Sequence, residues 1–266
     1  MEPKPTLPLD ILLHIIDLLA RSSGDSMDPN TIRSLQILSL ACKFMVPLCR
    51  KHLFSSICLF SESNTEHFRD LLSKNPDIAR YVRSLQVYYT FSYIHIGYEL
   101  NIMIDILKER SPLQSIQLSA LSDWDWNFFP ELIRSSLVSL IQLPTVTFLG
   151  IYSFKGFPVA VLSGCSNLIE LQLEDLRLDP PEVNQVISRS KIPTPVSLRI
   201  GKETYGLADL INSASRHLGG PIIDLSILQK ADFEVKSRDD LAQVYELIKV
   251  TTQLEHFTLR TCMSGE

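Results

Sequence analysis

The sequence predicts an α/β protein in which a short helical module precedes a curved parallel sheet of repeated strand–helix units. Two observations predict this class. The first is an apolar pattern with helical spacing over roughly the first sixty residues. The second is a six-residue strand pattern that recurs from residue 82 onward, with centres 22 to 33 residues apart. At 266 residues and 45% hydrophobic, the chain can bury a sizeable core.

A first helix is expected from Leu7 to about Arg21, with Thr6 as its N-cap and Pro8 at an early helical position. Its polar residues fall inside one wedge of roughly 60°: Asp10, His14, Asp17 and Arg21. The rest of the circumference is largely apolar: Ile11, Leu12, Leu13, Ile15, Ile16, Leu18 and Leu19. An ordinary surface helix buries only one stripe, so this helix carries more apolar surface than a small module can cover.

Two further helices are expected, from about Thr31 to Met45 and from Pro47 to near Phe54. The second helix has two apolar faces: Ile32, Leu35 and Leu38 on one, and Ile37, Leu40 and Phe44 on the other. Three helices in about fifty residues make a core too small to stand well alone. The surplus predicts either a permanent partner or burial beneath the next domain.

Three segments of this module resemble an F-box, in the form abundant in mushroom-forming fungi: Leu7–Leu12, Leu38–Lys43 and Cys49–Ile57. The resemblance covers roughly residues 6 to 58, and Met45 stands where the family often has Trp. It implies docking on the Skp-type linker subunit of a cullin-RING ubiquitin ligase. By position, the implied contact residues are Leu7, Pro8, Ile11, Ile15 and Leu38.

The strand pattern is an apolar residue, two others, an apolar residue, one other and an apolar residue. It occurs in seven segments: Val82–Val87, Leu113–Leu118, Val146–Ile151, Leu168–Leu173, Pro195–Ile200, Ile222–Ile227 and Leu254–Leu259. Helix-like stretches lie between them: Tyr98–Arg110, Phe129–Leu143, Gly206–Leu218 and Arg238–Val250. A strand and a helix alone bury neither face, so the units should stack into an irregular leucine-rich-repeat solenoid.

The predicted domains are a helical module at 1–60, a linker or capping helix at 61–81, and a repeat domain at 82–266. No polar capping helix is evident after the last strand pattern, as in a truncated repeat array. The structural competitor is a doubly wound α/β domain. Against it, the glycines lack the spacing of a phosphate-binding loop.

In a leucine-rich repeat the residues between the apolar strand positions face the concave surface. We therefore expect these residues to bind a substrate: Arg83, Gln86, Tyr88, Gln114, Gln117, Phe148, Glu170, Gln172, Glu174, Arg199, Asp224, His256 and Arg260. The middle of this set is polar and somewhat acidic, which suits a basic or hydrogen-bond-rich partner. The alternative is that these are simply solvated strand positions.

Both tryptophans of the chain, Trp124 and Trp126, lie in the connection after the second repeat strand. They fit a recognition loop, since exposed Trp residues often anchor interfaces. Equally, the indoles fit a packed position beneath the edge of the repeats.

Several function classes are disfavoured. The formal net charge of -5 gives no footprint for nucleic acid. The five cysteines form no C-x-x-C pair, and neither a signal peptide nor a membrane span is recognised, so we expect a cytoplasmic or nuclear protein. The scattered histidines suggest no metal site and no cofactor. Ser163-Gly164-Cys165 lacks the flanking Gly of a nucleophile turn and fits a helix end, so no catalytic residue is assigned.

The sequence therefore predicts a non-catalytic substrate adaptor of a Skp-cullin-F-box ubiquitin ligase, acting in ubiquitin-dependent protein degradation. The first alternative is a leucine-rich-repeat scaffold with no ligase role, in which the helical module caps the repeats and buries Ile11 and Ile15. The second is an α/β hydrolase or transferase, which needs a pocket holding a nucleophile, a base and an orienting group.

Overall fold

The structure is a computed structural model that describes residues 8–21, 28–41, 43–89, 97–179, 192–206 and 222–261. Its main sheet contains the following strands, in spatial order: β1 (Ser56–Leu59), β2 (Ser84–Tyr89), β3 (Ser115–Asp125), β4 (Phe148–Lys155), β6 (Glu170–Glu174), β8 (Ser197–Ile200), β9 (Lys230–Val235) and β10 (His256–Thr261). Every neighbouring pair in this sheet is parallel. The predicted α/β class with a parallel sheet is confirmed.

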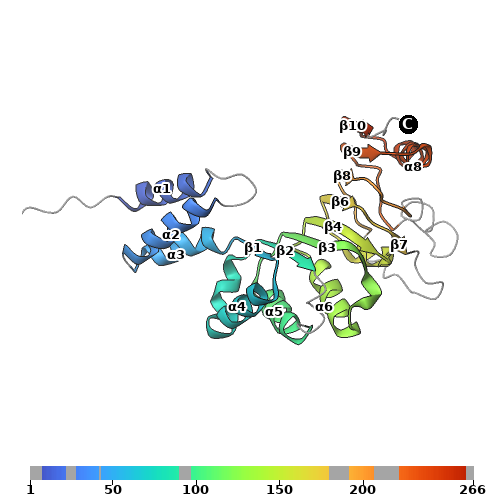
Figure 1. Cartoon of the computed structure of the whole chain (residues 1–266). Coiled ribbons are helices and arrows are strands. Elements are labelled where there is room, and N and C mark those ends of the chain that lie inside the picture. Colours follow the sequence, from blue (N-terminus) through green and yellow to red (C-terminus); the bar gives the residue numbers. More distant parts are fainter. Residues whose placement is uncertain are drawn as a thin grey trace, which may run out of the picture.

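The helices fall into two groups (Figure 1). The N-terminal helical module, residues 8–54, contains α1 (Leu9–Arg21), α2 (Pro29–Ala41) and α3 (Met45–Leu53). The sheet domain, residues 56–261, carries α4 (Glu62–Lys74), α5 (Gly97–Arg110) and α6 (Glu131–Ile141) on one face, and α8 (Arg238–Lys249) near β9. The described residues of this domain also include short 3-10 helices, η1 (Pro76–Tyr81), η3 (Trp126–Phe128) and η4 (Val159–Gly164), and a two-stranded parallel sheet of β5 (Phe157–Pro158) and β7 (Leu178–Asp179). The opposite face of the sheet is the open face.

The strands of the main sheet follow one another in chain order, without the reversal of a doubly wound sheet. One backbone motif recurs at the start of each strand. A carbonyl oxygen accepts two consecutive N–H groups from the next strand segment, and these acceptors are Ser55, Arg83, Gln114, Thr147, Ile169, Val196 and Gln229. The repetition of this contact means that the strands of the main sheet begin in the same way.

Buried and exposed residues alternate along the strands, and this alternation determines which residues form the core. In β2, Leu85, Val87 and Tyr89 are buried on the helix-covered face, whereas Tyr88 between them is exposed. Successive strand residues point to opposite faces, so each unit contributes its apolar positions to one continuous core beneath the sheet. Burying each large apolar side chain contributes about 1.5–3 kcal/mol.

One predicted strand is wrong. Ile222–Ile227 is not a strand, and the sixth predicted position is taken by β9, whose helix-facing residues are Ala231, Phe233 and Val235. Leu228-x-x-Ala231-x-Phe233 follows the same spacing, but alanine at the centre makes the signal weak. Asp224 therefore does not lie on the sheet: its carboxylate accepts the Ser226 N–H at 2.9 Å in a turn.

The sheet begins earlier than expected. Phe54-x-x-Ile57-x-Leu59 matches the strand pattern, and β1 lies inside the range assigned to the helical module. Residues 62–81 then form α4 and η1, which are the helical part of this first unit. Ser61 starts α4 as an N-cap, since its side chain accepts the Asn64 N–H at 3.2 Å.

The helix boundaries also differ at one junction. The second helix ends at Ala41 and not at Met45, because Met45 begins α3. Asp28 and Pro29 explain the start of α2: the Asp28 carboxylate accepts the Thr31 N–H at 3.2 Å, and proline suits the first helical position. Within the predicted helix Gly206–Leu218, residues 207–218 lie outside the described residues.

Both tryptophans pack inside the sheet domain. Trp124 and Trp126 are buried, and Trp126 stacks edge-on against Phe157 and Phe129, with ring centroids 5.0 and 5.4 Å apart. The packed interpretation is correct, and the recognition-loop interpretation is wrong.

Candidate functional site

The helical module has a small core of its own. Its buried apolar residues are Ile16, Leu35, Met45 and Cys49, with Leu12, Leu38, Leu48 and Leu53 packed around them. A hydrogen bond of 2.8 Å between His52 Nε2 and Asp17 Oδ1 holds α1 against α3. Lys51 Nζ lies 3.8 Å from the same oxygen. The polar wedge of α1 therefore contributes to contact with α3, and the core takes up only Ile16 and part of Leu12 among the apolar residues of α1.

An apolar stripe on α1 is uncovered. Ile11, Ile15 and Leu18 are 47%, 41% and 53% exposed. Their spacing of four and three residues places them on one side of the helix. In Figure 1, α1 lies apart from the sheet and its covering helices. The sheet domain therefore does not bury this stripe.

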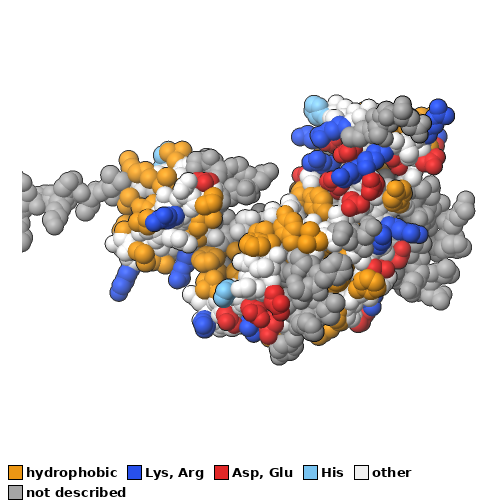
Figure 2. Space-filling model, viewed as in Figure 1, with side chains coloured by type: hydrophobic (Ala, Val, Ile, Leu, Met, Phe, Trp, Pro, Cys, Tyr) orange, Lys and Arg blue, Asp and Glu red, His pale blue; other side chains and the backbone are white. Residues whose placement is uncertain are grey.

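A second uncovered apolar group continues from α2 into the turn that follows it. Ile37, Leu40 and Phe44 are exposed, and Leu40 is the most exposed of the three, at 85%. Leu35, on the other face of α2, is fully buried. Hydrophobic side chains accordingly cover much of the visible face of the helical module (Figure 2). Single exposed apolar residues are ordinary, but a gathering of this kind on two helices is typical of a protein-binding surface.

The residues implied by the resemblance are distributed unevenly. Ile11 and Ile15 lie on the exposed stripe, and Pro8 is exposed just before α1. Leu38 is only half-buried and packs against the core of the module, so it contributes less free surface. Leu7 lies outside the described residues. Leu18, Ile37 and Leu40 were missed, although helical spacing from Ile11 indicates the first and the second apolar face of α2 indicates the others.

The second candidate surface is the open face of the sheet. Strand register arranges its side chains in three rows that cross the strands. The first row is Ser56, Ser84, Ser115, Phe148, Glu170, Ser197, Lys230 and His256. The second is Cys58, Gln86, Gln117, Gly150, Gln172, Arg199, Asp232 and Thr258. The third contains Tyr88, Ser119, Tyr152, Glu174, Glu234 and Arg260.

Most of the predicted substrate residues lie in these rows. Arg83 and Gln114 instead precede β2 and β3 at the N-terminal edge of the sheet, where their carbonyls bond to the next strand segment. At the β10 end, Arg260 donates to Asp232 at 2.8 Å and Arg199 Nε lies 3.9 Å from the same carboxylate. These cations are therefore paired within the chain.

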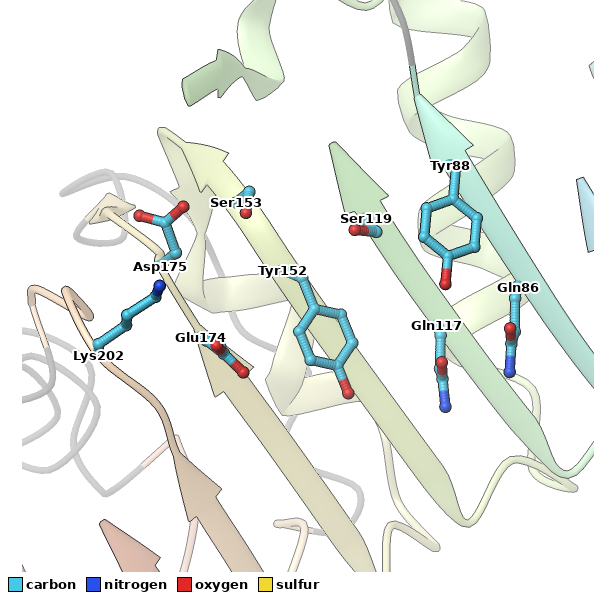
Figure 3. Close-up of a pocket in the computed structure, with 9 residues that line it drawn as sticks. All are labelled: Gln86, Tyr88, Gln117, Ser119, Tyr152, Ser153, Glu174, Asp175 and Lys202. Carbon is cyan, nitrogen blue, oxygen red and sulfur yellow. The ribbon is translucent and has the colours of Figure 1, made fainter. Parts of the chain in front are cut away.

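A pocket of about 310 Å³ lies where the third row crosses β2, β3, β4 and β6 (Figure 3). It is lined by Gln86, Tyr88, Gln117, Ser119, Tyr152, Ser153, Glu174, Asp175 and Lys202. The sequence prediction contained four of these residues, namely Gln86, Tyr88, Gln117 and Glu174. Tyr152 was missed, although alternation from Leu149 and Ile151 indicates that it faces the open side.

Glycines and hydrogen bonds fix the shape of this pocket. A Cβ at Gly150 would lie 2.7 Å from the Tyr152 ring, so the ring occupies the space left by the glycine. The Tyr152 hydroxyl donates to Gln172 Oε1 at 2.7 Å, and Gln172 Nε2 donates to Glu170 at 2.8 Å. Burial, opposed by Arg199 and aided by Glu174 and Glu170, raises the pKa of Tyr152, so its hydroxyl stays protonated at neutral pH.

Cys165 illustrates why the Ser163–Cys165 segment is not a nucleophile turn. Cys165 caps the end of η4, and its Sγ donates weakly to the Val161 carbonyl at 3.7 Å. Burial raises the pKa of its thiol to about 12. The reactive thiolate is therefore scarce at neutral pH.

We expect Cys165 to resist iodoacetamide at pH 7.5 in the folded protein and to react fully in urea. Among the cysteines that the structure describes, Cys58 is exposed and should be modified first. Peptide mapping by mass spectrometry after timed alkylation measures both. Equal labelling of Cys58 and Cys165 in the native protein would contradict the buried position.

No protein-family model matches this chain, and a search of curated proteins finds no relative. Within the described ranges, no group of three or more His, Cys, Asp and Glu side chains is arranged to hold a metal ion. None of the described helices has the length and apolar character needed to cross a membrane.

Proposed function

We propose that the chain is a substrate adaptor of a Skp-cullin-F-box ubiquitin ligase. The helical module is its F-box and binds the Skp-type linker subunit. The sheet domain is an irregular leucine-rich-repeat solenoid whose open face holds a protein substrate. The exposure of Ile11 and Ile15 is the observation that carries this proposal.

The helical module exposes more apolar surface than its own core covers. The module folds around Ile16, Leu35 and Met45, yet it leaves apolar stripes on both α1 and α2 in contact with water. Because these side chains on α1 are about half exposed, covering each of them with a partner is favourable by roughly 1 kcal/mol. This uncovered surface coincides with the α1 residues through which the F-box resemblance implies docking.

The alternative of a repeat scaffold with no ligase role requires a different position for the α1 residues. If the module merely capped the repeats, Ile11 and Ile15 would be buried by the sheet domain. α3 does contact η1 of the sheet domain, but Ile11 and Ile15 remain exposed on α1. This arrangement supports a partner outside the chain.

The order of the strands supports the second half of the proposal. Consecutive strands lie side by side, and each begins with the same carbonyl that accepts two N–H groups. A stack of equivalent units with helices on one face leaves a broad open face, as repeat proteins use for binding. The pocket between Tyr88 and Tyr152 is on that face.

The direct test is binding between the purified chain and a purified Skp-type linker subunit, measured by isothermal titration calorimetry. We expect a one-to-one complex with a Kd at or below the micromolar range. An unrelated protein of similar size and charge serves as the partner control. Absence of heat and of co-elution at micromolar concentration overturns the proposal.

A further inference from the structure

The pocket on the open face is a slot between two tyrosines. Tyr88 on β2 and Tyr152 on β4 occupy equivalent positions of the third row, and Ser119 on β3 lies between them. Two strand spacings separate them, so their backbones are about 9–10 Å apart. Figure 3 shows the two rings on either side of Ser119 and Gln117. Serine is small, which leaves room above it.

The two tyrosines suit a cation, because a cation is attracted to an aromatic face within about 6 Å of the ring centroid. Figure 3 shows both rings nearly face-on. The Tyr152 ring is held in place by its hydrogen bond to Gln172, so little entropy is lost when a ligand stacks on it. A planar guanidinium stacks on an aromatic ring better than an ammonium group does.

A carboxylate stands at the same site. Glu174 follows Tyr152 in the third row, and no salt bridge engages it among the described residues. Gly201 positions it: a Cβ there would lie 2.4 Å from Glu174 Cγ, so the Glu174 side chain rests against the sheet where the glycine leaves space. The Glu174 side chain therefore leans toward β8, and it lines the pocket on the strand next to Tyr152.

The other charges of the pocket lie farther along. Asp175 has a left-handed backbone with φ of 51°, and its N–H donates to the Lys202 carbonyl at 2.8 Å. In Figure 3 the Lys202 side chain extends toward Asp175, on the side away from Tyr88. The lining thus carries two carboxylates and one ammonium group. The net negative charge favours a positive ligand.

We propose that this slot receives an arginine side chain of the substrate protein. The arginine side chain passes over Ser119, and its guanidinium stacks on the Tyr152 ring and pairs with Glu174. The assignment rests on the proposed function in that the open face is taken as the substrate-binding surface. It adds the chemical class that this surface selects.

The test uses the full chain and three acetylated, amidated pentapeptides, Gly-Gly-X-Gly-Gly, in which X is arginine, citrulline or glutamate. Ligand-observed NMR measures their affinities. We expect the arginine peptide to bind in the millimolar range, about fivefold or more tighter than its neutral isostere citrulline, and the glutamate peptide to bind more weakly still. Equal binding of arginine and citrulline overturns the proposal.

Three variants test whether the preference for the arginine peptide arises at this pocket. Glu174→Gln should remove the preference for arginine over citrulline, and Ser119→Phe should fill the slot and weaken both peptides. Glu255→Gln, which removes an exposed carboxylate beside β10, should leave the preference unchanged. If Glu255→Gln abolishes the preference as fully as Glu174→Gln does, the effect is one of net charge and the slot is not the site.

Failure of this test and failure of the proposed function are distinguishable. The peptide measurements contain no linker subunit, and the linker measurements contain no peptide. A chain that binds the linker but shows no preference for arginine remains an adaptor with a different substrate chemistry.

Discussion

Replacing Ile11 and Ile15 together with aspartate is expected to abolish binding to the Skp-type linker, lowering the affinity by about 100-fold or more. Each change removes an apolar contact and places a carboxylate where the partner would exclude water. Both side chains are already largely exposed, so the fold of the chain should tolerate the change. Calorimetric titration against the linker gives the affinity, and circular dichroism during heating gives the stability.

The matched control is Leu132→Asp on α6. Leu132 is 55% exposed, comparable to Ile11, but it lies in the sheet domain. This variant carries the same kind of substitution and should bind the linker like the unmodified chain. If the Ile11 and Ile15 variant keeps its full affinity, the stripe on α1 is not the docking surface.

A second pair of substitutions separates docking from folding. Pro8→Ala combined with Ile11→Asp should also abolish linker binding and leave the sheet domain folded. Ile16→Asp, by contrast, charges a position that is buried in the core of the module and should unfold it. Loss of the sheet domain in the Pro8 and Ile11 variant would instead indicate that α1 has an internal role.

Much of the sheet was predictable because its signal is local. Each strand needs only three apolar residues at fixed spacing, and six of the seven predicted segments correspond to β2, β3, β4, β6, β8 and β10. The strand pattern is weak where its central residue is small. Ala231 contributes little hydrophobicity to the pattern of β9, so the pattern of Ile222–Ile227 was stronger and was assigned as the strand. Burial in the folded protein depends on neighbours, and Ala231 is buried by them.

The candidate site was less predictable because it depends on register. Alternation indicates that Tyr88 and Glu174 face the open side, but only strand pairing places Tyr152 between them in one row. The roles of Gly150 and Gly201 could not be predicted either. A glycine in a strand can leave space for another side chain, but the sequence does not show which side chain lies over it. The apolar surplus of the helical module was visible because it follows from helical spacing alone.

Trp126→Ala is expected to be among the most damaging single substitutions in the sheet domain, costing about 3–5 kcal/mol of unfolding free energy. Trp126 is 2% exposed, and its ring contacts Phe129, Phe154 and Phe157. Removing the indole leaves a cavity that three other rings cannot fill without leaving their own positions. Urea denaturation followed by circular dichroism measures the loss, and the melting temperature should fall by about 10 °C.

Phe128→Ala is the control for this effect. Phe128 neighbours the same cluster, with its ring 5.9 Å from Trp124, but it is 67% exposed. Its removal leaves no closed cavity, so the cost should stay below about 1 kcal/mol. A similar loss for both variants would mean that exposure does not decide stability at this edge of the sheet.

Trp126→Ala also tests whether the helical module and the sheet domain act independently. Ile16, Leu35 and Met45 form a core separate from the one that contains Trp126. Effects at distant sites with no shared contacts are usually additive. Trp126→Ala should therefore destabilise the sheet domain and leave the affinity for the linker unchanged at temperatures where the domain remains folded. A parallel loss of linker binding at those temperatures would show that docking requires the sheet domain, and the helical module alone would then not account for it.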